Sequence, residues 1–127
     1  MPARVGSRGA TLPPIKFTDP QTLDLTIYRG DSGRFRVTIV DDLGAPLDVS
    51  AATWDCDIRP DADGAVITSL TVTPVDSSTI EVALSAVESA ALVGPGVWDL
   101  EMTLNGEVTT LLVGRVTVTK DVSRTSP

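Results

Sequence analysis

The sequence predicts a single all-β domain: an immunoglobulin-like antiparallel β-sandwich of seven or eight strands, with one short connecting helix and an extended N-terminal arm. Three observations predict it. Apolar and polar residues alternate in short runs, as in half-buried strands. Turn-forming residues separate these runs about every 8–12 residues. Val, Ile and Thr, which suit pleated strands, recur along most of the chain, whereas aromatic residues make up only 4% of the 127 residues.

The first segment, residues 1–22, is predicted to be the extended arm. Its four prolines forbid a continuous helix and disfavour a central strand. Its apolar side chains are unusual for a solvated tail, so we expect them to dock on the body or on another subunit. The residues expected to bind a partner are the basic and apolar side chains of this arm: Arg4, Arg8, Leu12, Ile15, Lys16 and Phe17.

The sandwich domain is predicted to span residues 23–120, with a C-terminal tail at 121–127. Its first two strands are the alternating runs at 23–27 and 34–39. A Gly-containing turn joins them, and a second turn at 41–46 follows. The next strand contains Cys56 and ends before a turn at 60–64.

The second half of the domain contains a further strand region at 65–73, a strand at 80–84 and one short helix. Ser85 and Glu88 have the spacing of a capping box at the start of that helix. The chain closes with a hairpin whose Asn105-Gly106 pair favours a type I′ turn. Gly114 is expected to mark a bulge or bend in the return strand.

Charge and cysteine content exclude several classes of protein. The net charge is −7. The first 18 residues carry three basic groups and no acid, whereas the other 109 carry 7 basic and 17 acidic groups, a net charge of −10. An acidic body disfavours nucleic acid as a partner. No apolar run is long enough for a membrane helix, so no membrane partner is expected. Cys56 is the only cysteine, so no intrachain disulfide can form.

No catalytic, metal-binding or cofactor-binding residue is predicted. The chain has no histidine, which removes the commonest general base and the usual zinc ligand sets. A carboxylate pair could in principle support glycosidase chemistry. However, the acids at alternate strand positions are expected on outward, solvated faces, where charge discourages aggregation: Asp55, Asp57, Asp99 and Glu101.

Two short motifs have competing interpretations. Residues 61–64, Asp-Ala-Asp-Gly, begin like a calcium-binding loop, but the apolar residues that follow favour a simple turn. Residues 29–31 spell Arg-Gly-Asp, the tripeptide that integrins recognise. They fall where a turn between two strands is expected, and Gly30 suits that geometry, so a structural turn is the favoured interpretation.

Four stretches occur in a characteristic order. They are the turn and strand at 29–39, the turn-strand DDLGAPLDVSAAT at 41–53, the helix segment LSAVESAAL at 84–92, and the closing strands GVWDLE at 96–101 and GRVTV at 114–118. Together they resemble a family of tailed-bacteriophage virion domains, the immunoglobulin-like modules of tail tips and baseplates. This family includes the N-terminal domain of baseplate upper proteins.

The resemblance implies a structural virion protein: a minor tail, tail-tip or baseplate subunit that acts by protein–protein assembly. Its partners would be other virion structural proteins and copies of itself in a ring. Its location would be the virion tail, after synthesis in the host bacterial cytoplasm. Two alternatives stay open, a capsid decoration protein of the head and a carbohydrate-binding or adhesion module. The second would need an exposed aromatic platform.

Overall fold

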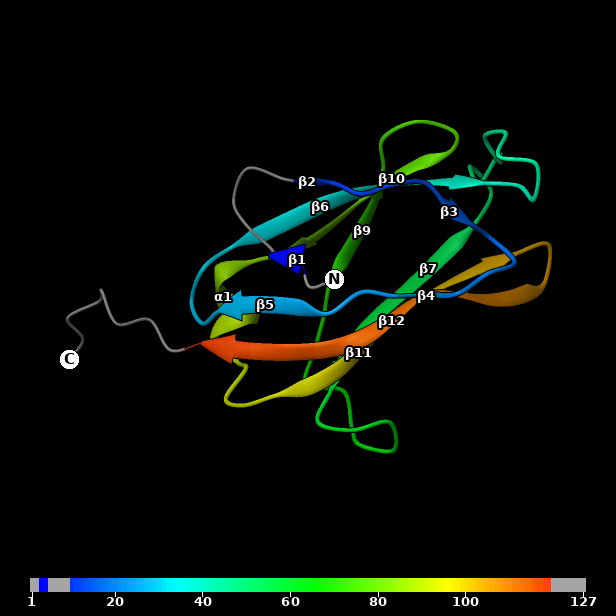
Figure 1. Ribbon diagram of the computed structural model, residues 1–127. Coiled ribbons are helices and arrows are strands. Elements are labelled where there is room, and N and C mark those ends of the chain that lie inside the picture. Colours follow the sequence, from blue (N-terminus) through cyan, green and yellow to red (C-terminus); the bar gives the residue numbers. More distant parts are fainter. Residues whose placement is uncertain (1–2, 5–9, 120–127) are drawn as a thin grey trace.

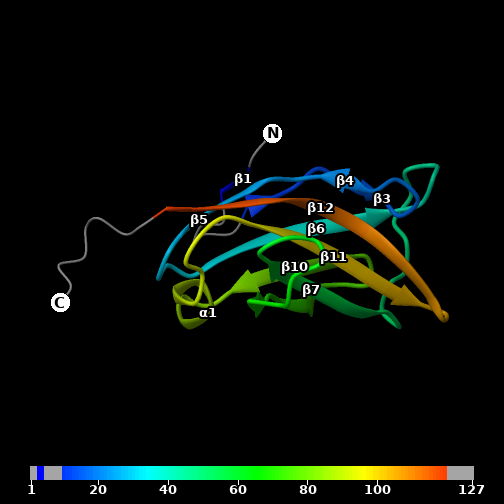
Figure 2. The same cartoon turned by 90° about the horizontal axis from the view of Figure 1, so that it is seen from below.

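The computed structural model describes residues 3–4 and 10–119, which form two facing β-sheets and one short helix (Figures 1 and 2). In chain order the elements are β1 (Ala3–Arg4), β2 (Ala10–Thr11), β3 (Ile15–Lys16), β4 (Gln21–Thr22), β5 (Leu25–Tyr28), β6 (Gly33–Val40), β7 (Thr53–Arg59), β8 (Thr68–Ser69), β9 (Thr71–Pro74), β10 (Thr79–Leu84), α1 (Ala86–Ala90), β11 (Gly96–Leu104) and β12 (Glu107–Thr119).

The strand order of the two sheets is that of an immunoglobulin-like domain. The first sheet has the order β1-β5-β12-β11-β7-β8, with β4 also paired to β12. The second sheet has the order β2-β6-β10-β9, with β3 also paired to β6. Strands β7, β11 and β12 take the places of C, F and G of an immunoglobulin domain, and β6, β10 and β9 take those of B, E and D. The predicted sandwich is therefore confirmed.

The sheets are mixed, however, and not wholly antiparallel as predicted. Strand β5 runs parallel to β12, as does β4, and β1 runs parallel to β5. In the second sheet, β2 and β3 run parallel to β6. Hairpin patterns predict only antiparallel neighbours, because a tight turn reverses the chain. The parallel pairs join strands that are distant in sequence or that cross between the sheets, where no hairpin sets the direction.

The core lies between the sheets and is built by the alternation that the sequence shows. On β6 and β10, every second side chain is buried. The rings of Phe35 and Trp98 meet edge to face across the core, with centroids 6.0 Å apart and planes at 77°. The other large buried side chains are aliphatic or methionine: Ile15, Leu25, Ile27, Ile39, Ile58, Ile80, Leu84, Leu92, Leu100, Met102 and Leu111.

The predicted helix cap and hairpin turn are both present. The Ser85 hydroxyl accepts a hydrogen bond from the Glu88 backbone N–H (3.1 Å), and the Ser85 N–H donates to the Glu88 carboxylate (2.8 Å). This capping box begins α1. Between β11 and β12, Asn105 (φ 54°) and Gly106 (φ 81°) both have positive φ, as a type I′ turn requires.

The region predicted as one strand at 65–73 is divided between the two sheets. Strand β8 pairs with β7 in the first sheet, and β9 pairs with β10 in the second. Leu70 lies between them, buried, and its N–H donates to the Cys56 carbonyl (2.8 Å). The chain thus crosses from one sheet to the other at this side of the sandwich.

We expected a bulge or bend in the return strand at Gly114, but the bulge is at Leu111. Leu100 pairs with Leu112 and Glu101 with Thr110, which leaves Leu111 as the extra residue. Gly114 is needed for a different reason. A Cβ atom at this position would lie 1.9 Å from the Leu23 carbonyl oxygen.

We predict that Gly114→Ala lowers the free energy of unfolding by about 1–3 kcal/mol or more, the usual cost of forcing extra atoms into a packed site. The added methyl would displace Leu23 and the Trp98 indole, whose Nε1 lies 2.9 Å from the ideal Cβ position. Urea unfolding measures the change. Gly94→Ala is the matched control, because nothing lies within 4 Å of its Cβ position. Equal stability of the two variants would contradict the prediction.

Candidate protein–protein interface

The described part of the predicted arm lies on the chain's own sandwich. Ile15 is 1% exposed and belongs to the core, and Leu12 and Phe17 pack against it. The sequence left two possibilities for these apolar side chains, docking on the body or on another subunit. Within the single chain they cover the open side of the body, where β2 and β3 pair with the edge of β6 and the apolar side chains pack against the core.

Backbone hydrogen bonds hold the arm along β6. The Leu12 N–H donates to the Arg36 carbonyl (2.9 Å), and the Phe17 N–H donates to the Val40 carbonyl (3.1 Å). Lys16 is exposed beside this edge. Of the other basic residues predicted to bind a partner, Arg4 belongs to β1, and Arg8 lies outside the described residues.

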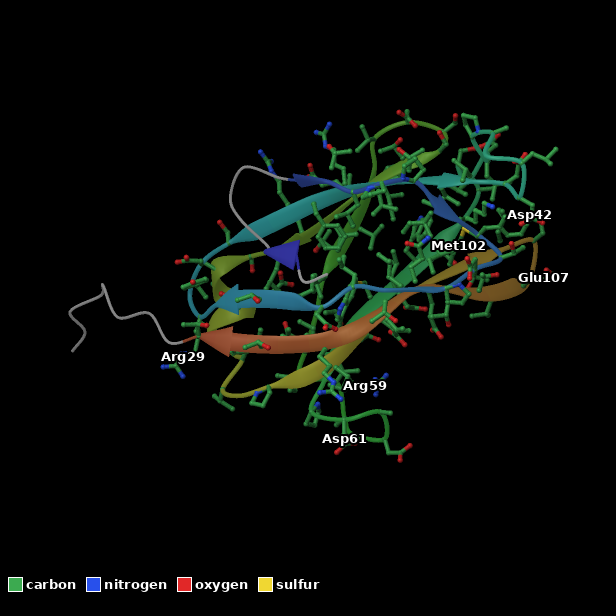
Figure 3. The ribbon with its side chains drawn as sticks, in the orientation of Figure 1. Arg29, Asp42, Arg59, Asp61, Met102 and Glu107 are labelled. Atoms are coloured by element: carbon green, nitrogen blue, oxygen red, sulfur yellow. The ribbon has the colours of Figure 1, made fainter. Side chains whose placement is uncertain are left out.

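One end of the sandwich presents two exposed apolar side chains, one on a tightly held turn and one at the start of β12. Leu43 is 94% exposed at the tip of the turn after β6. The Asp41 carboxylate accepts hydrogen bonds from the N–H groups of Leu43 and Ala45, both at 2.9 Å, and so fixes the turn. Val108, 64% exposed, lies in the closing hairpin. Figure 3 shows Asp42 and Glu107 at this same end.

Sequence reasoning missed this apolar end. It places Leu43 in the turn at 41–46 and gives it no role, although a leucine among turn-forming residues is itself a signal of an exposed apolar side chain. The neighbouring Asp42 accepts a hydrogen bond from the Thr18 hydroxyl. The turn is thereby tied to the segment that connects β3 to β4.

Four carboxylates form two cross-strand pairs on the outer face of the first sheet. Asp99 on β11 lies directly opposite Asp57 on β7, and Glu101 lies opposite Asp55. The Ser69 hydroxyl donates to Asp57 (2.7 Å), and the Arg59 guanidinium lies 3.8 Å from the same carboxylate. The predicted outward direction of all four is observed. Like charges placed opposite each other on neighbouring strands destabilise a sheet.

The electrostatic effect of this cluster appears in two pKa values. Partial burial, followed by the charge of Asp57, raises the pKa of Asp99 above its usual value. Partial burial and the charge of Asp99 likewise raise the pKa of Glu101. Beside the cluster, a hollow of about 280 Å³ is lined by Val97, Trp98 and other residues of β7, β11 and β12. The face can therefore attract cationic groups, and it holds a shallow apolar surface next to them.

The other motifs with possible chemistry have structural roles. Cys56 is buried, and burial raises the pKa of its thiol well above the usual range, which leaves it a small core residue. Gly30 (φ 91°) belongs to the turn between β5 and β6, and its N–H donates to the buried Ser89 hydroxyl (2.8 Å). In the Asp61 turn, the Asp63 N–H donates to the Asp61 carboxylate (3.0 Å).

Metal sites and membrane-spanning helices are absent from the described part of the chain. Within residues 3–4 and 10–119, no three His, Cys, Asp or Glu side chains are grouped so that they could hold a metal ion. The one helix in the same part of the chain is only five residues long, and no helix there could span a membrane.

We predict that Ile15→Ala lowers the free energy of unfolding by about 2–5 kcal/mol, the cost of removing a buried aliphatic side chain. The residue belongs to the core although it lies in the N-terminal arm. Leu43→Ala, at a side chain 94% exposed, is the control and should change stability little. Urea or thermal unfolding of both variants decides. A negligible effect of Ile15→Ala would show that the arm does not pack on the body in solution.

We predict that Asp99→Asn raises the free energy of unfolding at pH 7 by about 0.2–1 kcal/mol, because it removes a like charge opposite Asp57. Since the pKa of Asp99 is raised in the folded state, that state binds more protons than the unfolded state at pH values between the ordinary pKa and the raised one. The ionised Asp99 carboxylate therefore lowers the free energy of unfolding of the native protein at neutral pH. This destabilisation is lost as the pH falls through the raised pKa and the carboxylate takes up a proton.

The difference between native protein and Asp99→Asn should accordingly disappear at acidic pH, where both side chains are uncharged. Urea unfolding at a series of pH values measures it. Glu107→Gln, on the exposed hairpin away from the cluster, is the matched control. A stabilisation that is independent of pH, or that the control reproduces, would contradict this account.

Comparison with known proteins yields one informative likeness. No family model matches the sequence, and no curated protein matches it either. Among solved structures, the chain is similar to the N-terminal domain of phage TP901-1 ORF48, with a TM-score of 0.55 and 13% identity. The match covers 87% of this chain and 97% of that one.

Two weaker structural matches carry no argument. The endo-fucoidan hydrolase MfFcnA4 of glycoside hydrolase family 107 has a TM-score of 0.49 and 15% identity, over 80% of this chain and 13% of that chain. The ZIG-8 IG1 homodimer has a TM-score of 0.38 and 12% identity, over 77% of this chain and 79% of that chain. The likeness to the phage domain extends over nearly the whole of both chains, so the resemblance seen in the sequence is confirmed at the level of the fold.

Proposed function

We propose that this chain is a structural subunit of a tailed-phage virion, located at the tail tip or baseplate and acting through protein–protein contacts. One observation carries the proposal: a similar sandwich, matched over 87% of this chain and 97% of the other, is the N-terminal domain of a phage protein. The order of turn, helix and closing strands in the sequence supports it independently. The chain's own surfaces supply the means of assembly, as the next two features indicate.

The first feature is the apolar end of the sandwich. A leucine held almost fully exposed on a fixed turn gains free energy only when a partner covers it, at about 25 cal/mol per Å² of apolar surface removed from water. Leu43 supplies such surface on its turn, and Val108 supplies more at the start of β12, at the same end of the sandwich. We propose that this end contacts another virion protein.

The second feature is the unequal distribution of charge. The basic residues of the arm, Arg4, Arg8 and Lys16, contrast with an acidic body. The carboxylates of β7 and β11 add an acidic sheet face. Opposite charges on different surfaces of one chain favour contacts between a surface on one copy and a different surface on the next. Such head-to-tail contacts form a ring when the rotation between copies closes, and we propose a ring of copies within the particle.

The proposal is tested on purified particles of the phage that encodes the chain. We expect the protein to remain bound after density-gradient purification, in few or tens of copies per particle by quantitative mass spectrometry, and antibody labelling to mark the tail tip. Hundreds of copies, or labelling of the head, would indicate a capsid decoration protein instead. Absence from particles would overturn the structural role.

A surface variant tests the contact itself. Leu43→Asp should reduce incorporation into particles without lowering the melting temperature, because a charge on the exposed tip disrupts an apolar contact and not the fold. Val87→Asp, at an 83% exposed valine of α1, is the matched control at another position on the surface. Normal incorporation of Leu43→Asp would remove this end of the sandwich from the proposed contacts.

A further inference from the structure

We propose that residues 10–17 exchange between copies of this chain. In the exchanged form, the segment leaves the β6 strand of its own copy and pairs with β6 of a second copy in the same register. The partner is thus a second copy of this chain, and the contact is the one that the structure already shows within a single molecule.

The docking site and its occupant are both defined in the structure. Ala10 pairs with Phe35 and Thr11 with Arg36, and further along the same edge Ile15 pairs with Ile39. Ile15 then fills a core position at 1% exposure. Every copy carries both the segment and the edge, so a neighbour offers identical contacts. Exchange of an identical element between protomers is a low-cost route to association.

The connection to the body is short and bridges two sheets. Phe17 is hydrogen-bonded to β6 in the second sheet, whereas Gln21 pairs with Leu112 in the first. Only three residues, 18–20, join them, and the chain doubles back there (Figure 1). Pro20 further restricts the residue before it to extended conformations. Short, constrained connections favour exchange over the closed form.

The energetics also permit opening. The segment pairs with β6 through two residues in β2 and two in β3, and β1 of the same N-terminal stretch pairs with β5 through two more, so exchange opens these pairs as well. Segments near a terminus with few backbone pairs open at a lower free energy than the whole domain. The same pairs form after exchange, so the main cost is that of bringing two copies together. That cost falls when neighbours are held at high effective concentration, as in an assembled ring.

Cysteine cross-linking of the purified full-length chain tests the exchange. One variant carries Thr11→Cys and a size tag, and a second carries Arg36→Cys. The two positions are aligned across β2 and β6, and both are exposed, so a disulfide can form where the segments pair. We mix the variants, incubate them in dilute urea to allow opening, remove the urea and oxidise. A disulfide between the two variants requires the segment of one chain to lie on β6 of the other.

The control pair is Thr11→Cys mixed with Thr73→Cys. Thr73 is exposed on β9, at the opposite edge of the second sheet. We expect severalfold more mixed dimer from the Thr11 and Arg36 pair than from this control. Equal yields would overturn the proposal. The native Cys56 is buried and should not react.

Two further variants test the mechanism. A Gly-Ser-Gly-Ser insertion between Thr18 and Asp19 relaxes the connection and should lower the mixed-dimer yield severalfold; an unchanged yield would overturn the role of the short connection. The double variant Thr11→Cys/Arg36→Cys, oxidised as a dilute monomer, should stay monomeric by light scattering on later concentration. If it dimerises as the native chain does, the dimer does not form through this segment.

The inference identifies a partner for the proposed assembly and in that respect rests on the proposed function, but the two can fail separately. Cross-linking uses the purified chain alone, whereas the virion role is decided by incorporation into particles. Exchange without incorporation would leave the inference standing and remove the phage role. Incorporation into particles without exchange would leave the virion role standing and overturn the inference.

Discussion

One hydrogen bond, from the Trp98 indole N–H to the Leu23 carbonyl (2.8 Å), ties the N-terminal segment to the core. The bond joins the centre of the core to the backbone between β4 and β5. It is possible only because Gly114 has no side chain, since a Cβ there would overlap the Leu23 carbonyl. A buried indole that lost this acceptor would leave its N–H without a partner, at a cost of about 1–3 kcal/mol. The junction therefore fixes where the N-terminal segment meets the closing hairpin.

From that junction the chain extends in both directions along the open side of the sandwich. On the C-terminal side, β5 continues beside β12 as its parallel neighbour. On the N-terminal side, β4 pairs with β12 and the chain then crosses to β6. The other side of the sandwich is closed in a similar way, by the crossing from β8 to β9 around Leu70. Each side is thus covered by a segment that changes sheet.

The sequence was sufficient where local rules decide the structure. Alternation located the main strands, Ser85 and Glu88 located the helix, and Asn105-Gly106 located the hairpin turn. It was insufficient where long-range geometry decides. Whether Ile15 packs on its own body or on another chain depends on an edge that the strand order creates, and no local pattern encodes that order. Likewise, the sequence around Gly114 does not distinguish a glycine that allows a bulge from one that allows the backbone of another segment to approach closely.

The covered edges also limit how copies of this protein can associate. An exposed edge strand would offer its backbone to any neighbouring chain. Here β6 is covered by the chain's own residues 10–17, and β9 at the other edge of the second sheet is short and ends in Pro74, which has no N–H to donate. Side-by-side strand pairing at β6 therefore requires the covering segment to leave first. Since the segment that leaves is also the one that pairs with this edge in the single chain, the proposed association through β6 would be selective for copies of the same chain, whereas the apolar end of the sandwich would stay available to unlike partners.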